Sequence, residues 1–311
     1  MLDVNEALAN PSVMGALTGL TPDEFRSLVP TFTQAWEEHT RLNWMGAPRR
    51  RAAGAGPRSE LESSELKLFF ILFYLRQYPI QEVMGFYFGF SQEQANRWIM
   101  RLVPLLQTTL ERHLAMPERR TEGLDQVLAK CAQEKVFLDG TDRPIRRPQD
   151  PQRQKDCYSG RKKRHTVKNL VLTQERVIQF VSPTAPGSQA DLTLAQPLAQ
   201  VAFPKHSLVL TDLGFLGLEL PHATLAQPAK KPKNRELAPW NKQINRLLAG
   251  VRVKIEHVLG SVKRCRIVSD PFRNLKNGFD DVVMGLTCGL HNFREAHRRG
   301  PVPVLLPIQR N

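Results

Sequence analysis

Three acidic residues are attached to apolar segments that should form the core. Asp139 follows a Val-Phe-Leu run, Asp212 follows Leu-Val-Leu-Thr, and Glu256 follows Ile255 in a second apolar segment. A buried carboxylate costs free energy unless a counter-charge or a metal ion compensates it. The chain must therefore fold so that each acid meets a cation, and a shared divalent metal ion is one way to satisfy all three.

The charge of the whole chain indicates its partner. Its 311 residues include 44 Lys and Arg against 30 Asp and Glu, which gives a net charge of +14. Such an excess favours nucleic acid or another anionic surface. A merely solvated basic surface is the alternative, and the clustering of the charges argues against it. Acids on core segments of a very basic chain suggest a metal site that faces a polyanion.

The cysteines and the apolar segments indicate the cellular compartment in which the protein works. Four scattered cysteines, Cys131, Cys157, Cys265 and Cys288, form no Cys-x-x-Cys pair, which predicts reduced thiols and argues against zinc. The N-terminus lacks the basic and apolar regions of a secretory signal. The longest apolar run, residues 69–75, is too short to span a bilayer. We expect a cytoplasmic protein with no membrane partner.

The first two regions are a helical segment and a linker. Residues 1–47 form the N-terminal helical segment, in which Thr21 and Glu24 predict a capping box at a helix start. Residues 48–58 form a basic linker, because Gly and Pro break all periodicity there. Its arginines either contact phosphates or belong to an ordinary linker; they are Arg49, Arg50 and Arg51.

Residues 59–128 are expected to form a helix-turn-helix DNA-binding domain. A helix with an apolar face, a short helix, a turn and a helix capped by Ser91 follow one another. Polar side chains at the start of the last helix can contact base edges or phosphates. A plain three-helix packing unit is the alternative. The outward residues are Gln92, Asn96, Arg97 and Arg101.

From residue 129 to residue 311 the pattern changes to an α/β domain with a mixed sheet. Short runs rich in Val, Ile, Leu and Phe predict strands, and longer periodic stretches predict helices between and after them. The expected strands are 136–141, 166–172, 177–182 and 207–212, and the expected helices are 188–200, 240–262 and 279–297.

We expect the fold to bring the three acids together. Asp139 is predicted to end the first strand and Asp212 the fourth, while Glu256 lies at the border of the apolar face of the long helix. Their oxygens suit two Mg²⁺ or Mn²⁺ ions. For any one acid the alternative is a salt bridge to arginine. Asp142 is an alternative ligand but fits a turn better, and Asp191 fits a position near a helix cap.

Three clusters of basic residues accompany the acids. Because they precede or follow the acidic segments, all three could flank one groove and neutralise phosphates. Tyr158 could stack on a base or sugar, or pack internally. The first cluster is Arg161, Lys162, Lys163, Arg164, His165 and Lys168, the second is Lys230, Lys231 and Lys233, and the third is Lys263, Arg264 and Arg266.

Four stretches together carry a family resemblance. Residues 138–145, 154–169, 211–217 and 256–267 closely resemble the catalytic domain of bacterial insertion-sequence transposases, in the group related to Harbinger-type elements. The likeness extends from about residue 45 to residue 297. It implies an RNase H-like catalytic domain preceded by an α-helical helix-turn-helix region. It also implies a catalytic, metal-binding Asp-Asp-Glu (DDE) triad at Asp139, Asp212 and Glu256.

The resemblance further implies a reaction and partners. A DDE transposase cleaves the 3′ ends of a mobile element, recognised through its terminal inverted repeats, and joins them to target duplex DNA. Because two ends are handled together, a homodimer on DNA is expected. Two alternatives remain: a catalytically inactive DNA-binding protein derived from a transposase, and a metal-dependent nuclease that cuts DNA without joining it.

Overall fold

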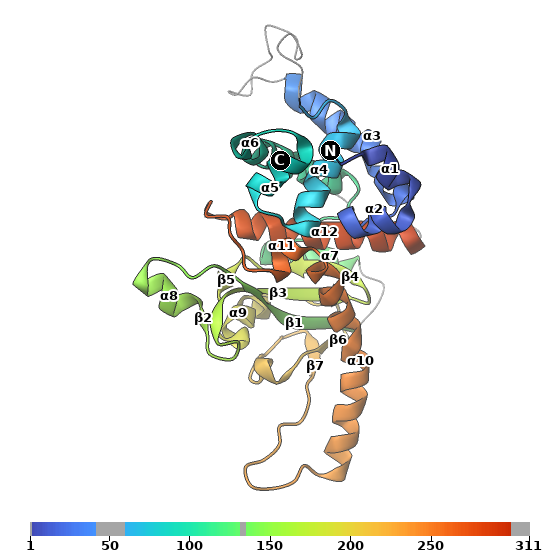
Figure 1. Ribbon diagram of the computed structural model, residues 1–311. Helices are drawn as coiled ribbons and strands as arrows, with labels where there is room; N and C mark the ends of the chain where they lie inside the picture. Colours follow the sequence, from blue (N-terminus) through green and yellow to red (C-terminus); the bar gives the residue numbers. More distant parts are fainter. Residues whose placement is uncertain (1, 42–59, 131–134, 300–311) are drawn as a thin grey trace. The chain divides into compact units, whose positions relative to one another are not determined.

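The computed structural model describes residues 2–41, 60–130 and 135–299 (Figure 1). The chain divides into two compact units. The first contains Met1–Ala115 with Arg264–Ile267, and the second contains Met116–Lys263 with Val268–Asn311. Within the described ranges, every helix is too short or too polar to cross a lipid bilayer. The linker at 48–58, with Arg49, Arg50 and Arg51, lies outside the described residues.

The first unit opens with three helices, α1 (Val4–Ala9), α2 (Pro11–Thr18) and α3 (Pro22–Arg41). The predicted capping box at the start of α3 is confirmed. The Thr21 N–H donates to Glu24 Oε2 over 2.8 Å, and the Glu24 N–H donates to Thr21 Oγ1 over 3.2 Å. Two backbone donors that the helix leaves unpaired are satisfied in this way.

The next three helices match the expected helix-turn-helix layout. They are α4 (Ser64–Gln77), α5 (Gln81–Phe88) and α6 (Gln92–Arg112). All residues of α4 from Lys67 to Leu75 are buried, so this helix forms the centre of the unit. The tight turn after α5 requires glycine at Gly85, where a Cβ would lie 2.3 Å from the carbonyl oxygen of Phe90. Ser91 and Gln94 form the expected capping box of α6.

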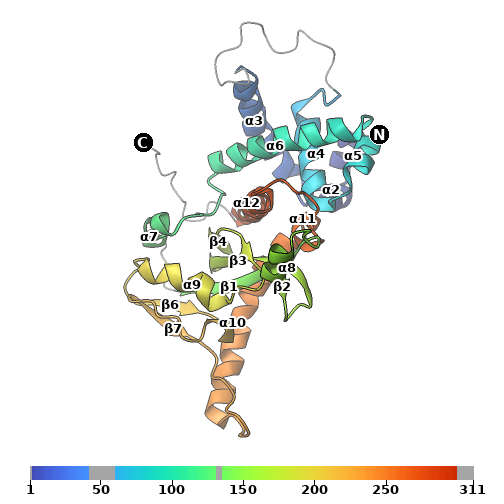
Figure 2. The same ribbon diagram turned by 90° about the vertical axis from the view of Figure 1, so that its left-hand side faces the viewer.

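The second unit is built on a mixed sheet (Figures 1 and 2). The strand order is β2-β3-β1-β6-β7, with β4 and β5 also paired to β3. β1 is antiparallel to β3 and parallel to β6, which is parallel to β7. The strands are β1 (Lys135–Pro144), β2 (Tyr158–Ser159), β3 (Arg164–Gln174), β4 (Val177–Val181), β5 (Ala185–Pro186), β6 (Ser207–Leu210) and β7 (Ala223–Ala226).

Helices complete this RNase H-like α/β domain. α12 packs on β4 and is buried along most of its length, and α10 packs on both α12 and β1. Residues 116–128, assigned above to the helix-turn-helix region, instead contact β4. The helical elements are α7 (Thr121–Ala129), α8 (Pro151–Cys157), α9 (Asp191–Ala195), η1 (Gln196–Gln200), η2 (Leu213–Phe215), α10 (Pro239–Lys263), α11 (Arg266–Ser269) and α12 (Phe279–Arg299).

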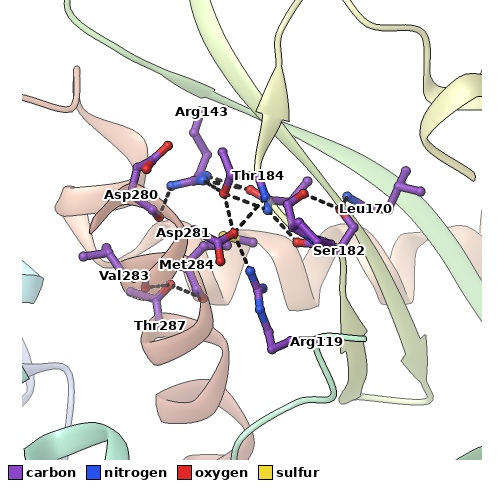
Figure 3. A network of polar contacts seen from close by, with 12 residues as sticks. Arg119, Arg143, Leu170, Ser182, Thr184, Asp280, Asp281, Val283, Met284 and Thr287 are labelled. Atoms are coloured by element: carbon purple, nitrogen blue, oxygen red, sulfur yellow. Dashed lines mark hydrogen bonds and ion pairs between the residues drawn. The ribbon is translucent and has the colours of Figure 1, made fainter. Parts of the chain in front are cut away.

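A buried arginine joins the central strands to α12 (Figure 3). Arg143, on β1, is only 2% exposed and donates two hydrogen bonds to Asn169 Oδ1 on β3, over 3.1 and 2.8 Å. It also donates to the Asp280 carbonyl over 2.9 Å and to Thr184 Oγ1 over 3.0 Å. Burial lowers the pKa of Arg143 to about 10, so the guanidinium stays charged at neutral pH. This network fixes β1 four residues beyond Asp139.

Candidate metal centre and nucleic-acid interface

Asp139 lies in the middle of β1, and the prediction that it ends the strand is wrong. The strand continues to Pro144 because every residue from Val136 to Pro144 pairs with β3. Asp139 Oδ1 accepts a hydrogen bond from the N–H of Gly140 over 2.8 Å. The carboxylate is therefore held at a central strand, where regular backbone on both sides fixes its position.

Asp212 comes two residues after the end of β6. Its Oδ1 accepts a hydrogen bond from the N–H of Gly214 over 2.8 Å and so caps η2. In the parallel pairing of β1 with β6, Phe137 lies opposite Leu210. Asp139 and Asp212 each follow this pair by two residues, so both acids lie just beyond the end of the β1–β6 pairing.

The electrostatics agree with this register. Burial raises the pKa of Asp139 to about 6, with further contributions from the negative charges of Asp212 and Asp191, while Arg252 opposes the shift. In the described parts of the chain, no ion pair involves Asp139, Asp212 or Glu256. The two aspartates are therefore neighbours, and Arg252 acts on Asp139 through space without forming an ion pair with it.

Glu256 lies on α10, which packs on β1, and its side chain is exposed. Four residues earlier on the helix, Arg252 interacts with Asp139 through space, and seven residues later Lys263 does the same. Residues at these spacings share one helix face. Glu256 therefore lies on the stripe of α10 that these two cations show to be turned toward Asp139.

The structure nevertheless does not gather the three acids. Among the described residues, no three His, Cys, Asp or Glu side chains lie close enough together to hold one ion. Asp139 and Asp212 are brought together, and Glu256 remains apart on the facing helix. The donor chemistry fits a hard divalent cation, because a partly buried pair of carboxylates without an ion-pair partner among the described residues offers oxygen ligands only.

Two further acids border the pair. Asp142 lies within β1, not in the turn that we predicted, and accepts a hydrogen bond from Thr166 Oγ1 over 3.3 Å. Asp191 is the first residue of α9 and forms an ion pair with Lys168 at 3.0 Å. The sequence placed Asp191 only near a helix start, and nothing in its spacing indicated a position beside the two aspartates.

The helix-turn-helix unit presents part of the predicted surface. Gln92, Asn96 and Arg97 are exposed at the start of α6. Asn96 Oδ1 accepts a hydrogen bond from Gln81 on α5 over 3.1 Å. Arg101 differs, because its guanidinium lies 4.3 Å from the centre of the Trp36 ring, in cation–π contact. The guanidinium of Arg101 therefore contacts an aromatic ring of the protein itself.

The basic residues of the second unit lie at two places. Arg161, Lys162 and Lys163 are exposed between β2 and β3, Arg164 is exposed at the start of β3, and the centre of the Tyr158 ring lies 5.6 Å from that of His165. A loop before α10 exposes the second group, Lys230, Lys231 and Lys233.

Lys263, from the third basic cluster, lies near Lys162 of the first cluster. Partial desolvation of the ammonium and the nearby positive charge of Lys162 lower the pKa of Lys263, while the negative charges of Asp142 and Asp139 oppose this shift. Cations from two clusters thus lie near the acidic pair. Lys168 is buried instead and donates to the Gln189 carbonyl over 3.0 Å. Arg264 and Arg266 are exposed and belong to the first unit.

Comparisons with known proteins agree with this arrangement. A family model described as DDE superfamily endonuclease matches residues 138–292, and one described as the helix-turn-helix of that superfamily matches residues 59–112. A probable transposase for insertion sequence element IS702 from Microchaete diplosiphon is 27% identical over 279 residues, covering 89% of this chain and 96% of that protein. No solved structure matches. The two matched regions, in this order, identify the chain as a member of the DDE endonuclease superfamily with its helix-turn-helix domain.

Proposed function

We propose that this protein is a DNA transposase. It cleaves the 3′ ends of a mobile element in a metal-dependent reaction and transfers them into target DNA. The observation that carries the proposal is the pair Asp139 and Asp212, each two residues beyond the last paired residues of the parallel strands β1 and β6, close enough for their charges to interact and without an ion pair in the described residues. The similarity to a probable insertion-sequence transposase over nearly its whole length supports the same reading.

The three acids are assigned to metal binding. Asp139, Asp212 and Glu256 would hold two Mg²⁺ or Mn²⁺ ions, which activate an attacking hydroxyl and stabilise the leaving oxygen of a phosphodiester. One carboxylate oxygen of Asp139 and one of Asp212 each accept a hydrogen bond from a glycine N–H, which fixes the direction of both side chains. To bind the same ions, the side chain of Glu256 must move from α10 toward the two aspartates. Bound DNA would favour this movement, because its phosphates would attract Arg252 and Lys263 on the same face of α10.

DNA is the substrate class that the charges fit. The exposed basic residues near the acidic pair would contact phosphates and lower the repulsion between DNA and carboxylates. In the first unit, Gln92, Asn96 and Arg97 would read the terminal inverted repeats from the start of α6. Because two ends must be cut and joined together, the active form would be a homodimer on DNA, in the bacterial cytoplasm.

A joining assay tests the proposal. A short duplex that ends in the DNA flanking the coding sequence, already cleaved at its 3′ end, is incubated with a supercoiled plasmid and Mg²⁺. We expect joined products, lost in Asp139→Ala and retained in Glu219→Ala, whose carboxylate is exposed. Joining that survives Asp139→Ala would contradict the assignment.

The same assay separates the two alternatives. A nuclease that cuts without joining would cleave an uncut element end in Mg²⁺ but would give no joined product from the pre-cleaved end. An inactive DNA-binding protein would retain the end fragment in a gel-shift experiment and do neither.

A further inference from the structure

The carboxylate of Asp191 lies between the backbones that carry Asp139 and Asp212. A Cβ built on Gly140, the residue after Asp139, would meet Asp191 Oδ1 at 2.7 Å. A Cβ built on Gly214, two residues after Asp212, would meet Asp191 Oδ2 at 3.0 Å. The distance at Gly140 is shorter than carbon and oxygen tolerate, and the distance at Gly214, where Asp212 Oδ1 would also lie 2.9 Å away, is tight, so the carboxylate borders the space that a side chain at either glycine would need.

These two glycines are the donors that hold the acids. The Gly140 N–H bonds to Asp139 Oδ1 and the Gly214 N–H bonds to Asp212 Oδ1, each over 2.8 Å. One carboxylate packed against both glycines therefore sets the spacing between the two donors. Through them it sets the spacing and direction of the two aspartates.

Asp191 is itself held by a buried lysine. Lys168, on β3, approaches Asp191 Oδ1 within 3.0 Å, and the two side chains are only 11% and 17% exposed. The same ammonium donates a hydrogen bond to the Gln189 carbonyl over 3.0 Å, two residues before Asp191. Lys168 thus ties both the start of α9 and its first carboxylate to the central sheet.

We propose that Asp191, held by Lys168, is a positioning residue that fixes the Asp139–Asp212 pair in the geometry needed to bind a divalent cation. This inference rests on the proposed function of that pair. Asp191 acts through the two glycines and not as a metal ligand, because the ion pair with Lys168 already balances its charge, although its Oδ1 accepts no hydrogen bond from the described residues.

Binding of Mn²⁺ to the full-length, DNA-free protein, measured by isothermal titration calorimetry, tests the role directly. Asp191→Ala removes the carboxylate that packs against the two glycines. Lys168→Met keeps that carboxylate but removes the ammonium that holds it. Each should weaken Mn²⁺ binding about tenfold or more, in the range found when groups that orient metal ligands are removed. Asp191→Asn keeps the shape and should stay within about threefold of the native affinity. Asp139→Asn should lose binding.

The outcomes separate the possible roles. Asp191→Asn that loses Mn²⁺ as fully as Asp139→Asn would make Asp191 a ligand and overturn the inference. Native affinity in Lys168→Met, which tests the same contact if Asp191→Ala does not fold, would also overturn it. Asp139→Asn that binds Mn²⁺ as well as the native protein would instead overturn the proposed function, so the two failures are distinguishable.

A double variant tests the contact without relying on metal. Gly140→Ala drives a methyl group against Asp191 and should lower the midpoint of thermal unfolding. Adding Asp191→Ala removes the obstacle and should recover most of that loss. Gly160→Ala is the control, since nothing lies within 4 Å of a Cβ there. Strictly additive effects of the two substitutions would show that the glycine and Asp191 do not meet.

Discussion

At the scale of single residues, Asp139 is placed for function at a cost in stability. Its folded pKa, about 6, lies above its ordinary value of 3.8, so burial penalises the ionised form. The penalty is complete above pH 6 and disappears as the pH falls through 6 toward 3.8, where the unfolded chain also takes up its proton. A shift of this size corresponds to roughly 2–3 kcal/mol.

We therefore expect Asp139→Asn to raise the stability of the metal-free protein at neutral pH, by about 1–3 kcal/mol. The amide keeps the shape of the side chain and removes the buried charge. Urea unfolding in the presence of a chelator measures the effect, with Glu219→Gln as the exposed control. A destabilised Asp139→Asn protein would show that the ionised carboxylate is already compensated by the fold.

The same pKa predicts how metal binding depends on pH. A protonated Asp139 cannot serve as a ligand, so protons compete with the cation as the pH falls. We expect the Mn²⁺ affinity to be nearly constant above pH 7 and to fall about tenfold for each unit well below the pKa of about 6. Calorimetric titrations at several pH values measure this. An affinity that does not change across this range would exclude Asp139 as a ligand.

At the scale of elements, the sequence predicted what is local. Apolar periodicity and capping residues predicted α3, α6, α10 and α12 closely, because those signals lie within each helix. It did not predict β2, β5 and β7, which have two to four residues each and exist because a longer strand pairs with them. It also ended this strand at residue 141, whereas the pairing with β3 shows that β1 continues to Pro144.

The candidate site follows the same division. Asp139 and Asp212 were predictable because each follows an apolar strand in the sequence. Asp191 was not, because its importance arises from contacts with two glycines on other segments. Lys168 was assigned to DNA from its basic neighbours, while the structure pairs it with Asp191. Burial and partners, which spacing alone does not show, decide between these roles.

The junction of β1, β3 and α12 yields a stability prediction. Arg143→Met would leave Asn169, Thr184 and the Asp280 carbonyl without their buried donor. We expect a loss of about 2–4 kcal/mol in the free energy of unfolding. Urea denaturation measures it, with Arg120→Met as an exposed control on the same unit. A loss below about 1 kcal/mol would show that the network contributes little.

The basic clusters yield a binding prediction. Lys162→Ala and Lys263→Ala each remove a cation near the acidic pair, and each should weaken DNA binding while lowering the slope of affinity against salt by about one. Gel-shift titrations at several salt concentrations measure this. Lys205→Ala, exposed in a loop before β6, is the control. Unchanged slopes would place the DNA path elsewhere.

At the scale of the whole molecule, the proposed function assigns DNA recognition to the first unit and DNA cleavage and joining to the second. The helix-turn-helix surface contains polar side chains without a metal-binding pair, and the sheet domain contains the acids with cations around them. This division matches the two family regions, residues 59–112 and 138–292. Sequence-specific binding and cleavage should therefore be separable by substitution, with Asn96→Ala affecting the first and Asp212→Ala the second.

The most direct test of the account is the position of Mn²⁺ in crystals of the protein bound to an element end, located by anomalous scattering. The account predicts density for manganese bound by Asp139 and Asp212, with Glu256 brought in from α10 as the third carboxylate. Manganese bound elsewhere, or a Glu256 side chain that stays in solvent while the other two acids bind the ion, would contradict it.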